Sequence, residues 1–309
     1  MSQAAASSSS PSPSVLVVGA SSGFGAAAAT RFLDAGFTVV GTSRRASALT
    51  AIDPGVVNLA PVDVTDQDSV DALLAALGAV GFRPSVLVLN AGYGEAGPVE
   101  ASSVDALHAQ LDTNLYGVHR LVGAFLPSLR ETGGRILIVG SLAARVPIPF
   151  QALYSASKAA VASYAGALRQ EVMGFGIHVT VVEPGDHATA FGASRTTVSQ
   201  ADYEPQASLA IGTMEAAERA GGSPDDVARV LVRLASKRRP PFRRFVGSVS
   251  ERFLLVMRAL LPHRWFERMV MWHFAVPATS RGRLRMRAEP QSSSGTLLDG
   301  PSSGRVPTV

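Results

Sequence analysis

A regular alternation of short apolar runs with longer helical segments limits what this chain can fold into. Each run has four to six residues rich in Val, Ile and Leu, which is typical of a strand buried on both faces. Such strands form parallel sheets that helices cover on both sides. The sequence therefore predicts an α/β fold, a doubly wound parallel sheet of the Rossmann type. The expected strands are residues 15–18, 37–42, 56–61, 86–89, 135–139 and 177–182, and the expected helices are 26–35, 66–80, 103–130 and 154–175.

The alternation stops after the sixth strand. Helices are expected at residues 199–219 and 224–236, and a last short strand is expected around Phe245. Residues 250–274 are rich in Leu, Met, Phe and Trp. Pro262 is expected to divide them into two helices, because proline is tolerated at a helix start but not inside a helix. The sequence thus adds a C-terminal helical extension to the predicted sheet.

Composition and charge exclude several kinds of function. The 309 residues include no cysteine, which rules out disulfides, thiolate catalysis and cysteine-based zinc sites. The first 14 residues lack a basic residue, and no stretch of about 18 apolar residues exists, so we expect neither a targeting signal nor a spanning helix. Residues 237–287 carry a net charge of +11, against −7 for the rest of the chain. This asymmetry indicates either an anionic surface as partner or a solvated face.

Three glycines occupy the turn between the first strand and the first helix: Gly19, Gly23 and Gly25. Glycine lets the backbone turn tightly there and lets a pyrophosphate approach the free N–H groups of the helix start. The spacing differs from the G-x-G-x-x-G of the usual dinucleotide fingerprint, and the alternative is an ordinary glycine-rich turn. The position directly after the first strand favours a dinucleotide site.

Tyr154 and Lys158 are four residues apart in an expected helix, so their phenol and ammonium groups share one face. A neighbouring cation favours phenolate, and we expect it to lower the pKa of Tyr154, as general acid/base catalysis needs. Ser141 ends the fifth expected strand, where open α/β sheets bind ligands, and its hydroxyl is suited to hold a carbonyl oxygen. Taken singly, these residues also fit a solvated helix face and a turn serine.

Together these motifs resemble the short-chain dehydrogenase/reductase family, and in particular its NADP-dependent steroid- and retinoid-converting branch. The resemblance runs from about residue 15 to about residue 235, with the motifs in family order. Besides the residues above, it includes Asp63 after the third strand, Asn90-Ala91-Gly92 after the fourth, Asn114 in the long helix, and Pro184-Gly185-x-x-x-Thr189 after the sixth.

The resemblance implies a role for each of these positions. Tyr154 would exchange a proton with the substrate oxygen, and Ser141 would hold that oxygen. Lys158 would lower the pKa of Tyr154 and bind the nicotinamide ribose, and Asn114 would support a proton-relaying water behind Lys158. No metal site is expected. The expected cofactor-binding residues, besides Tyr154 and Lys158, are Gly19, Ser21, Ser22, Gly23, Phe24, Gly25, Ser43, Arg44, Asp63, Val64, Asn90, Ala91, Gly92, Pro184, Gly185 and Thr189.

The choice between NAD and NADP depends on the end of the second strand. An acidic residue there accepts a hydrogen bond from a ribose 2′-hydroxyl, whereas arginine pairs with a 2′-phosphate. Ser43 stands where an NAD-dependent relative would carry Asp, and Arg44 follows it. An exposed arginine pair, Arg44 with Arg45, is the alternative. The sequence favours NADP(H) as the cofactor.

We therefore predict an NADP(H)-dependent oxidoreductase that reduces a ketone or aldehyde, or oxidises the matching alcohol, with a lipophilic compound as the expected substrate. The alternative is a non-catalytic NADP(H)-binding sensor or scaffold, which would typically lack the Tyr, Lys or Ser of the site. Residues 14–249 are expected to form the Rossmann-fold catalytic domain, and residues 250–280 an apolar and basic helical extension. Residues 1–13 and 281–309 are rich in small and polar residues, and we expect them to be disordered.

The extension leaves three hypotheses open: a core-packed helix pair, a lid over the substrate cleft, or peripheral membrane contact through residues 250–287. The expected partners are a small-molecule carbonyl compound or alcohol, with no nucleic acid. The resemblance also implies a homodimer or homotetramer, because members of the family commonly pack as dimers through the long helix, which here carries His108 and His119. The expected location is the cytoplasm, with peripheral attachment to membranes as the alternative.

Overall fold

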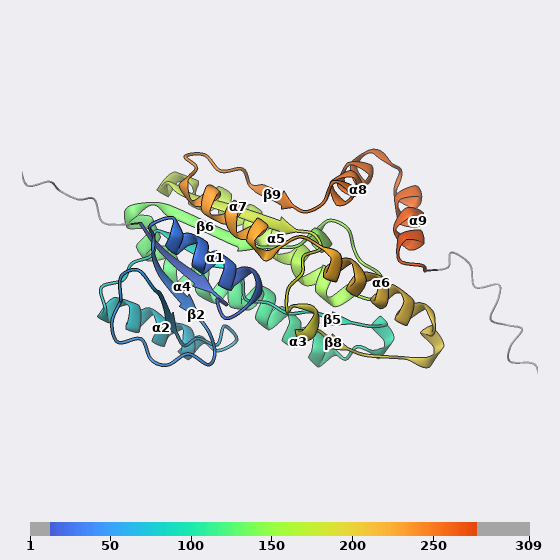
Figure 1. Ribbon diagram of the computed structural model, residues 1–309, viewed down its shortest axis with the longest axis horizontal. Coiled ribbons are helices and arrows are strands. Elements are labelled where there is room, and N and C mark those ends of the chain that lie inside the picture. The colour runs from blue at the N-terminus through green and yellow to red at the C-terminus, as the bar shows by residue number, and fades with distance from the viewer. Residues whose placement is uncertain (1–12, 277–309) are drawn as a thin grey trace, which may run out of the picture. The chain divides into compact units, whose positions relative to one another are not determined.

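The structure is a computed structural model that describes residues 13–276. A parallel sheet of seven strands forms the centre of the fold (Figure 1). The strand order is β3-β2-β1-β4-β6-β7-β9, and every neighbouring pair is parallel. The six predicted strands and the one around Phe245 are confirmed. The strands are β1 (Ser14–Val18), β2 (Thr38–Thr42), β3 (Val57–Ala60), β4 (Val86–Leu89), β6 (Gly134–Val139), β7 (Ile177–Pro184) and β9 (Arg243–Val246).

Helices cover both faces of this sheet, and the alternation of side chains along each strand decides which helix a residue meets. Leu16 and Val18 of β1 pack in one core with the first group of helices, while Val15 and Val17 pack in a second core with the other group. Successive strand residues point to opposite faces, so both sets are apolar and both faces are buried. The first group is α2 (Gln67–Ala79), α4 (Gly117–Thr132) and α5 (Ala152–Val172), and the second is α1 (Gly23–Asp34) and α7 (Pro224–Ser236).

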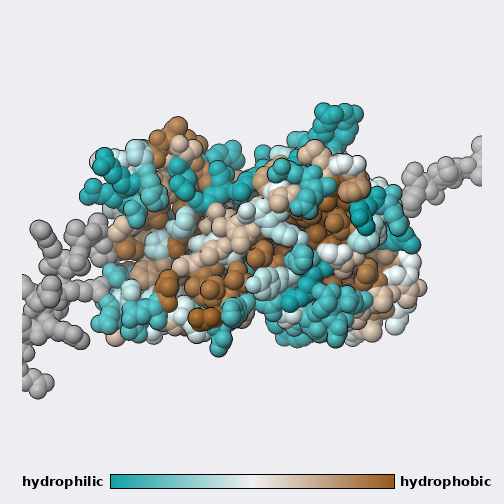
Figure 2. All heavy atoms as spheres, turned by 180° about the vertical axis from the view of Figure 1, so that it is seen from behind, coloured by the Kyte–Doolittle hydropathy of each residue, from teal (hydrophilic) through white to brown (hydrophobic). Residues whose placement is uncertain are grey.

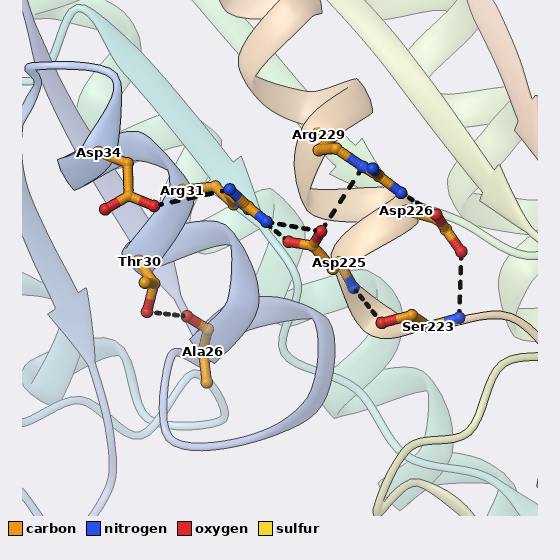
Figure 3. A network of polar contacts seen from close by, with 8 residues as sticks. All are labelled: Ala26, Thr30, Arg31, Asp34, Ser223, Asp225, Asp226 and Arg229. Carbon is orange, nitrogen blue, oxygen red and sulfur yellow. Dashed lines mark hydrogen bonds and ion pairs between the residues drawn. The ribbon is translucent and has the colours of Figure 1, made fainter.

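Charged side chains join the two helices of the second group across more than 190 residues of sequence (Figure 3). Arg31 of α1 donates two hydrogen bonds to the Asp225 carboxylate, at 2.5 and 2.8 Å. Asp225 lies in the first turn of α7, where Ser223 and Asp226 form a capping box. The same carboxylates complement the helix dipole, so this end of α7 is fixed by its cap and by α1.

The predicted long helix at residues 103–130 differs in one detail. It consists of α3 (Val104–Leu111), a π-helical turn (Asp112–Tyr116) and α4, which continues to Thr132. A π turn inserts one extra residue into the helix and is frequent at functional sites. It carries Asn114, whose side chain it turns into the protein interior.

Two further features were not predicted correctly. Strands β5 (Glu95–Ala96) and β8 (Thr196–Thr197) pair as a separate small sheet, which is too short to give a pattern in the sequence. The helix expected at residues 199–219 is instead a 3-10 turn (Ala201–Tyr203) followed by α6 (Gln206–Ala220). Proline at position 205 removes a backbone donor, so the α-helix begins only after it.

The C-terminal extension is a pair of helices, α8 (Val249–Leu260) and α9 (His263–His273), with Pro262 between them as predicted. Leu255 of α8 and Phe266 of α9 are buried against Leu142 and Val146 of the sheet domain. One face of the pair is therefore packed into a core of its own. None of the helices among residues 13–276 is long and apolar enough to cross a membrane. The expected disordered segments 1–13 and 281–309 lie outside the described residues, apart from residue 13.

Candidate active site

A cavity of about 870 Å³ opens at the carboxyl ends of the central strands. This is the edge of an open α/β sheet at which ligands bind. Nearly all the predicted site residues line it, and the two exceptions, Gly25 and Asn114, lie directly behind its wall. The predicted residues that line the cavity are Gly19, Ser21, Ser22, Gly23, Phe24, Ser43, Arg44, Asp63, Val64, Asn90, Ala91, Gly92, Ser141, Tyr154, Lys158, Pro184, Gly185 and Thr189.

The glycine-rich turn from β1 into the start of α1 has the backbone conformation expected of its glycines. Gly19 and Gly23 have φ angles of +78° and +54°, which glycine adopts without strain. A Cβ on Gly25 would lie 2.0 Å from the carbonyl oxygen of Gly19 and 2.7 Å from Nδ2 of Asn90. Asn90 itself donates a hydrogen bond to that carbonyl oxygen, at 2.9 Å. Gly25 therefore serves the packing of the loop, whereas Gly19 and Gly23 face the cavity.

The start of α1 fits an anionic ligand such as a dinucleotide pyrophosphate. Its first turn contains no acidic residue, and the N-cap Ser22 makes no side-chain hydrogen bond to it. The free N–H groups of a helix start attract a phosphate, and the helix dipole adds to that attraction. Gly19 and Gly23 line the cavity without a side chain of their own, so the backbone donors at this helix start are open to such a group.

Two charged residues lie at the far end of the same cavity, beyond β2 and β3. The Asp63 carboxylate accepts hydrogen bonds from the backbone N–H and the hydroxyl of Thr65, at 3.0 and 2.7 Å. These bonds, helped by the positive charge of Arg44, lower the pKa of Asp63. Arg44 is exposed beside the cavity and follows Ser43 at the end of β2. This end of the cavity therefore pairs an ionised carboxylate with an exposed guanidinium.

Tyr154, Ser141 and Lys158 meet at the other end of the cavity, on α5 and after β6. A hydrogen bond joins the hydroxyl of Ser141 to the phenol of Tyr154, and Ser141 also accepts from the N–H of Ala143, at 3.1 Å. Lys158 donates from Nζ to the carbonyl oxygen of Val139, at 3.0 Å, and lies 5.8 Å from the centroid of the Tyr154 ring. Tyr154 and Lys158 are both buried.

The pKa of Tyr154 departs from the sequence-based expectation. Burial raises it to about 12, and the hydrogen bond from Ser141 opposes this only in part. Burial also lowers the pKa of Lys158 to about 8. The expected lowering of the Tyr154 pKa is therefore wrong for the chain alone, because the removal of the phenol from water outweighs the hydrogen bond from Ser141.

Asn114 lies behind the cavity rather than in its wall. From the π turn, its Nδ2 donates to the carbonyl oxygen of Tyr93 at 3.0 Å and to the hydroxyl of Ser157 at 2.9 Å. Its Oδ1 accepts from the N–H of Tyr93, at 3.1 Å. A Cβ on Gly92 would touch this oxygen and approach Nζ of Lys158, at 3.0 and 3.5 Å. Asn114 thus ties the loop after β4 to α5, and its expected role in holding a water stays a prediction.

Several cavity residues escaped the sequence analysis, because nothing in their local pattern distinguishes them. Gln151 is buried one helical turn before Tyr154, and its Nε2 has no hydrogen-bond partner among the described residues. The Phe191 ring lies 5.4 Å from the ring of Tyr154. Met214 and Glu218 of α6 complete this wall. Gln151 is the N-cap of α5, and a glutamine at that position carries no pattern that marks it as a site residue.

Glu251 of α8 contacts the loop that follows β7 and begins with Gly185. Its Oε1 accepts a hydrogen bond from the N–H of Asp186, at 2.6 Å, and its Oε2 accepts from the N–H and the hydroxyl of Ser248, both at 2.7 Å. Burial and the charge of Glu251 raise the pKa of Asp186 to about 7. One carboxylate therefore caps α8 and holds the rim of the cavity.

Comparison with known proteins assigns the family. Residues 13–199 match the family model described as short chain dehydrogenase, so the chain belongs to the short-chain dehydrogenase/reductase family and is an oxidoreductase of that class. The chain is 33% identical over 263 residues to a 3-ketodihydrosphingosine reductase of Bacteroides thetaiotaomicron, a match that spans 84% of this chain and 96% of that protein. The Rossmann-type sheet and nucleotide-binding class predicted from the sequence are thereby confirmed.

Solved structures agree with this assignment. A short-chain dehydrogenase from Streptomyces avermitilis superimposes with a TM-score of 0.72 at 30% identity, over 86% of this chain and 97% of that one. A serine dehydrogenase in complex with NADP+ has a TM-score of 0.66 at 27% identity, over 77% and 95%. A 3-ketoacyl-(acyl-carrier-protein) reductase from Brucella melitensis in complex with NADH has a TM-score of 0.62 at 26% identity, over 76% and 96%. Structural neighbours thus bind either nicotinamide cofactor.

Proposed function

We propose that this protein uses NADP(H) to reduce a ketone or aldehyde, or to oxidise the matching alcohol, with Tyr154 as general acid and base. The observation that carries the proposal is the shared cavity: Ser141, Tyr154 and Lys158 line one end, while the glycine loop and Arg44 line the rest. A non-catalytic cofactor-binding protein would have no need for a buried phenol that is hydrogen-bonded to a serine beside a buried amine.

Three side chains share the proposed proton transfer. Tyr154, with a pKa near 12, carries its proton at neutral pH and donates it to the alkoxide oxygen formed during reduction. The Ser141 hydroxyl donates a hydrogen bond to the same oxygen. Lys158 stabilises the phenolate left behind, because its ammonium is the nearest cation on the same helix. When bound, the nicotinamide supplies or accepts the hydride.

The preference for NADP(H) rests on the end of β2. Ser43, Arg44 and Arg45 line the cavity there, without an acidic residue among them. A guanidinium pairs with a 2′-phosphate in a charge-assisted hydrogen bond, whereas a carboxylate at this point would repel it. Asp63 is the nearest acidic residue in the wall, and its carboxylate is already bound to Thr65. These contacts support the proposal of a 2′-phosphate at Arg44.

A lipophilic carbonyl compound is the proposed substrate. The wall near Tyr154 includes the apolar side chains of Leu142, Ile148, Phe191 and Met214. The unpartnered Nε2 of Gln151 offers one hydrogen-bond donor in the same wall. Ligand sites of this composition are mostly apolar, with a few polar groups that fix orientation. The Bacteroides relative is named for a keto substrate, which supports a carbonyl compound.

The test is Tyr154→Phe, assayed by NADPH consumption over a panel of long- and short-chain ketones and aldehydes. The variant is expected to bind NADPH as the wild type does, and to lose about 10²–10⁴-fold or more in turnover, since it lacks the transferable proton. Tyr164→Phe, further along α5 and bonded to His119, is the control and is expected to retain activity. Retention of more than about a tenth of the wild-type turnover by Tyr154→Phe contradicts the assignment. NADPH binding without turnover of any carbonyl by the wild type favours the sensor or scaffold.

A further inference from the structure

Helix α8 carries a row of apolar side chains that no other described residue covers. Val249, Phe253, Val256 and Leu260 follow one another at intervals of four, three and four residues, which places them on one face of the helix. Their exposed fractions are 86, 58, 47 and 70%. Leu255 is buried in the body of the protein, so α8 is apolar on a packed face and also on a free one. Figure 2 shows hydrophobic surface at this end of the molecule, flanked by hydrophilic side chains.

Helix α9, which follows α8 directly, exposes two tryptophans, the only two in the chain. Trp265 and Trp272 are seven residues apart, hence on one face, and they are 53% and 82% exposed. The guanidinium groups of Arg264 and Arg268 lie 5.8 and 5.9 Å from the centroid of the Trp265 ring. Exposed indole rings beside arginines are typical of the lipid–water interface, where the ring is half buried and the cation meets phosphate.

We propose that this surface, the exposed apolar residues of α8 and α9 with their arginines, docks on an anionic phospholipid bilayer. Arg252, Arg264 and Arg268 are exposed beside the apolar row, and they attract anionic headgroups. The two helices together contain four arginines, against the two acidic residues Glu251 and Glu267, so they keep a net positive charge. Two copies of the chain that met through this surface would bring the arginines of each against those of the other, which disfavours self-association.

The dimensions require the pair to lie along the membrane rather than across it. Helices of 12 and 11 residues are about 18 and 17 Å long at about 1.5 Å per residue, whereas a bilayer core is about 30 Å thick. Both helices have an apolar face and a basic border, which is the composition of helices that insert into the headgroup region. The membrane contact is therefore peripheral.

The position of the docking surface connects it with the cavity. Leu142 packs against Leu255 and Phe266 of the helix pair and also lines the cavity next to Ser141. A bilayer on the free face of α8 and α9 would therefore be separated by this helix pair from the wall that receives the substrate. This step rests on the proposed function: a lipophilic carbonyl compound would dissolve in the bilayer on one side of the pair and react in the cavity on the other.

The test uses the full-length protein with vesicles of phosphatidylcholine alone or mixed with phosphatidylglycerol. Because both tryptophans lie in α9, a blue shift of intrinsic fluorescence on vesicle addition reports on this helix alone. Flotation gives the partition coefficient. The variant Phe253→Ser/Leu260→Ser removes two of the four side chains of the apolar row. Val104→Ser/Met173→Ser is the control, since these two residues are comparably exposed elsewhere, at 67 and 59%.

The expected result is a blue shift and flotation with the anionic vesicles, and partitioning at least about tenfold weaker with phosphatidylcholine alone. Phe253→Ser/Leu260→Ser is expected to lose at least about tenfold in partitioning at an unchanged melting temperature, and the control variant less than about twofold. Arg264→Gln/Arg268→Gln is expected to reduce the preference for anionic lipid.

Three results would overturn the proposal: no flotation of the wild type, equal partitioning of the α8 and control variants, or an unshifted tryptophan emission. Light scattering without vesicles measures the oligomeric state and so tests the alternative, that the surface binds a second copy of the chain. If Phe253→Ser/Leu260→Ser converts a dimer into a monomer and no vesicle binding exists, the surface joins two copies of the chain and the proposal is wrong. Vesicle binding without carbonyl reduction leaves the docking intact and refutes the proposed function, so the two failures are distinguishable.

Discussion

Lys158 should make this protein less stable at neutral pH than a variant without its charge. The ammonium is buried, and burial lowers its pKa from 10.5 to about 8. At about 1.36 kcal/mol per pKa unit, keeping the proton on Lys158 costs the folded state about 3 kcal/mol at pH 7. Between pH 8 and 10.5 the folded chain loses this proton while the unfolded chain retains it. The unfolded state then binds more protons, so the cost falls as the pH rises.

The assay is urea unfolding of the wild type and Lys158→Met, followed by circular dichroism at pH 7 and pH 10. The difference in unfolding free energy between the two proteins should shift by about 2–3 kcal/mol in favour of the wild type over this range. Other titrating groups are common to both proteins and cancel. Lys237 is the only other lysine of the chain and is exposed, so Lys237→Met is a matched control whose difference should stay constant. A difference for Lys158→Met that does not change with pH refutes the reasoning.

Other substitutions test the cofactor loop, the cofactor choice and the contact of α8. Arg44→Ala should raise the KM for NADPH about 10- to 150-fold, because it loses a charge-assisted hydrogen bond worth about 1.5–3 kcal/mol, and should leave the KM for NADH unchanged. The double variant Arg44→Ala/Ser43→Asp should prefer NADH. If both variants still prefer NADPH, Arg44 does not select the cofactor. Gly25→Ala should abolish cofactor binding, because its Cβ would lie 2.0 Å from the carbonyl oxygen of Gly19. The control Gly78→Ala has no atom within 4 Å of its Cβ, so in thermal unfolding it should be neutral or stabilising by up to about 1 kcal/mol. Glu251→Gln should lower the melting temperature by about 2–4 °C through a weaker helix cap and raise the KM for the cofactor, and an unchanged KM would show that the Asp186 contact is only structural.

The order of strands and helices could be predicted because burial on both faces leaves a strong signal. Runs such as the one that became β4 are apolar at every position and flanked by polar turns, so neither a helix nor an edge strand accounts for them. The π turn that carries Asn114 left no such signal. A helix with one extra residue per turn differs from an α-helix in geometry and not in composition. The short pairing of β5 with β8 depends on contacts between distant segments, which local patterns do not contain.

The site was predictable where a residue type is tied to a place in the fold. Gly19, Gly25 and Tyr154 each sit at a fixed distance from a strand or helix end, so their meeting in one region followed from topology. Electrostatics were not predictable in the same way. The pKa of Tyr154 depends on how completely the phenol leaves water, and the spacing to Lys158 carries no information about depth. Gln151 and Phe191 belong to the wall through tertiary packing alone.

The contact of the Glu251 carboxylate with Asp186 extends the catalytic domain beyond the predicted boundary at residue 249. A chain cut before α8, at the end of the predicted domain, would leave the N–H of Asp186 without its acceptor, and the space beside Gly185 would open to solvent. The extension is thus a structural part of the cavity rim rather than an appendage. Chimeras that exchange C-terminal segments between members of this family need to place the junction after α9, or to carry a carboxylate at the position of Glu251.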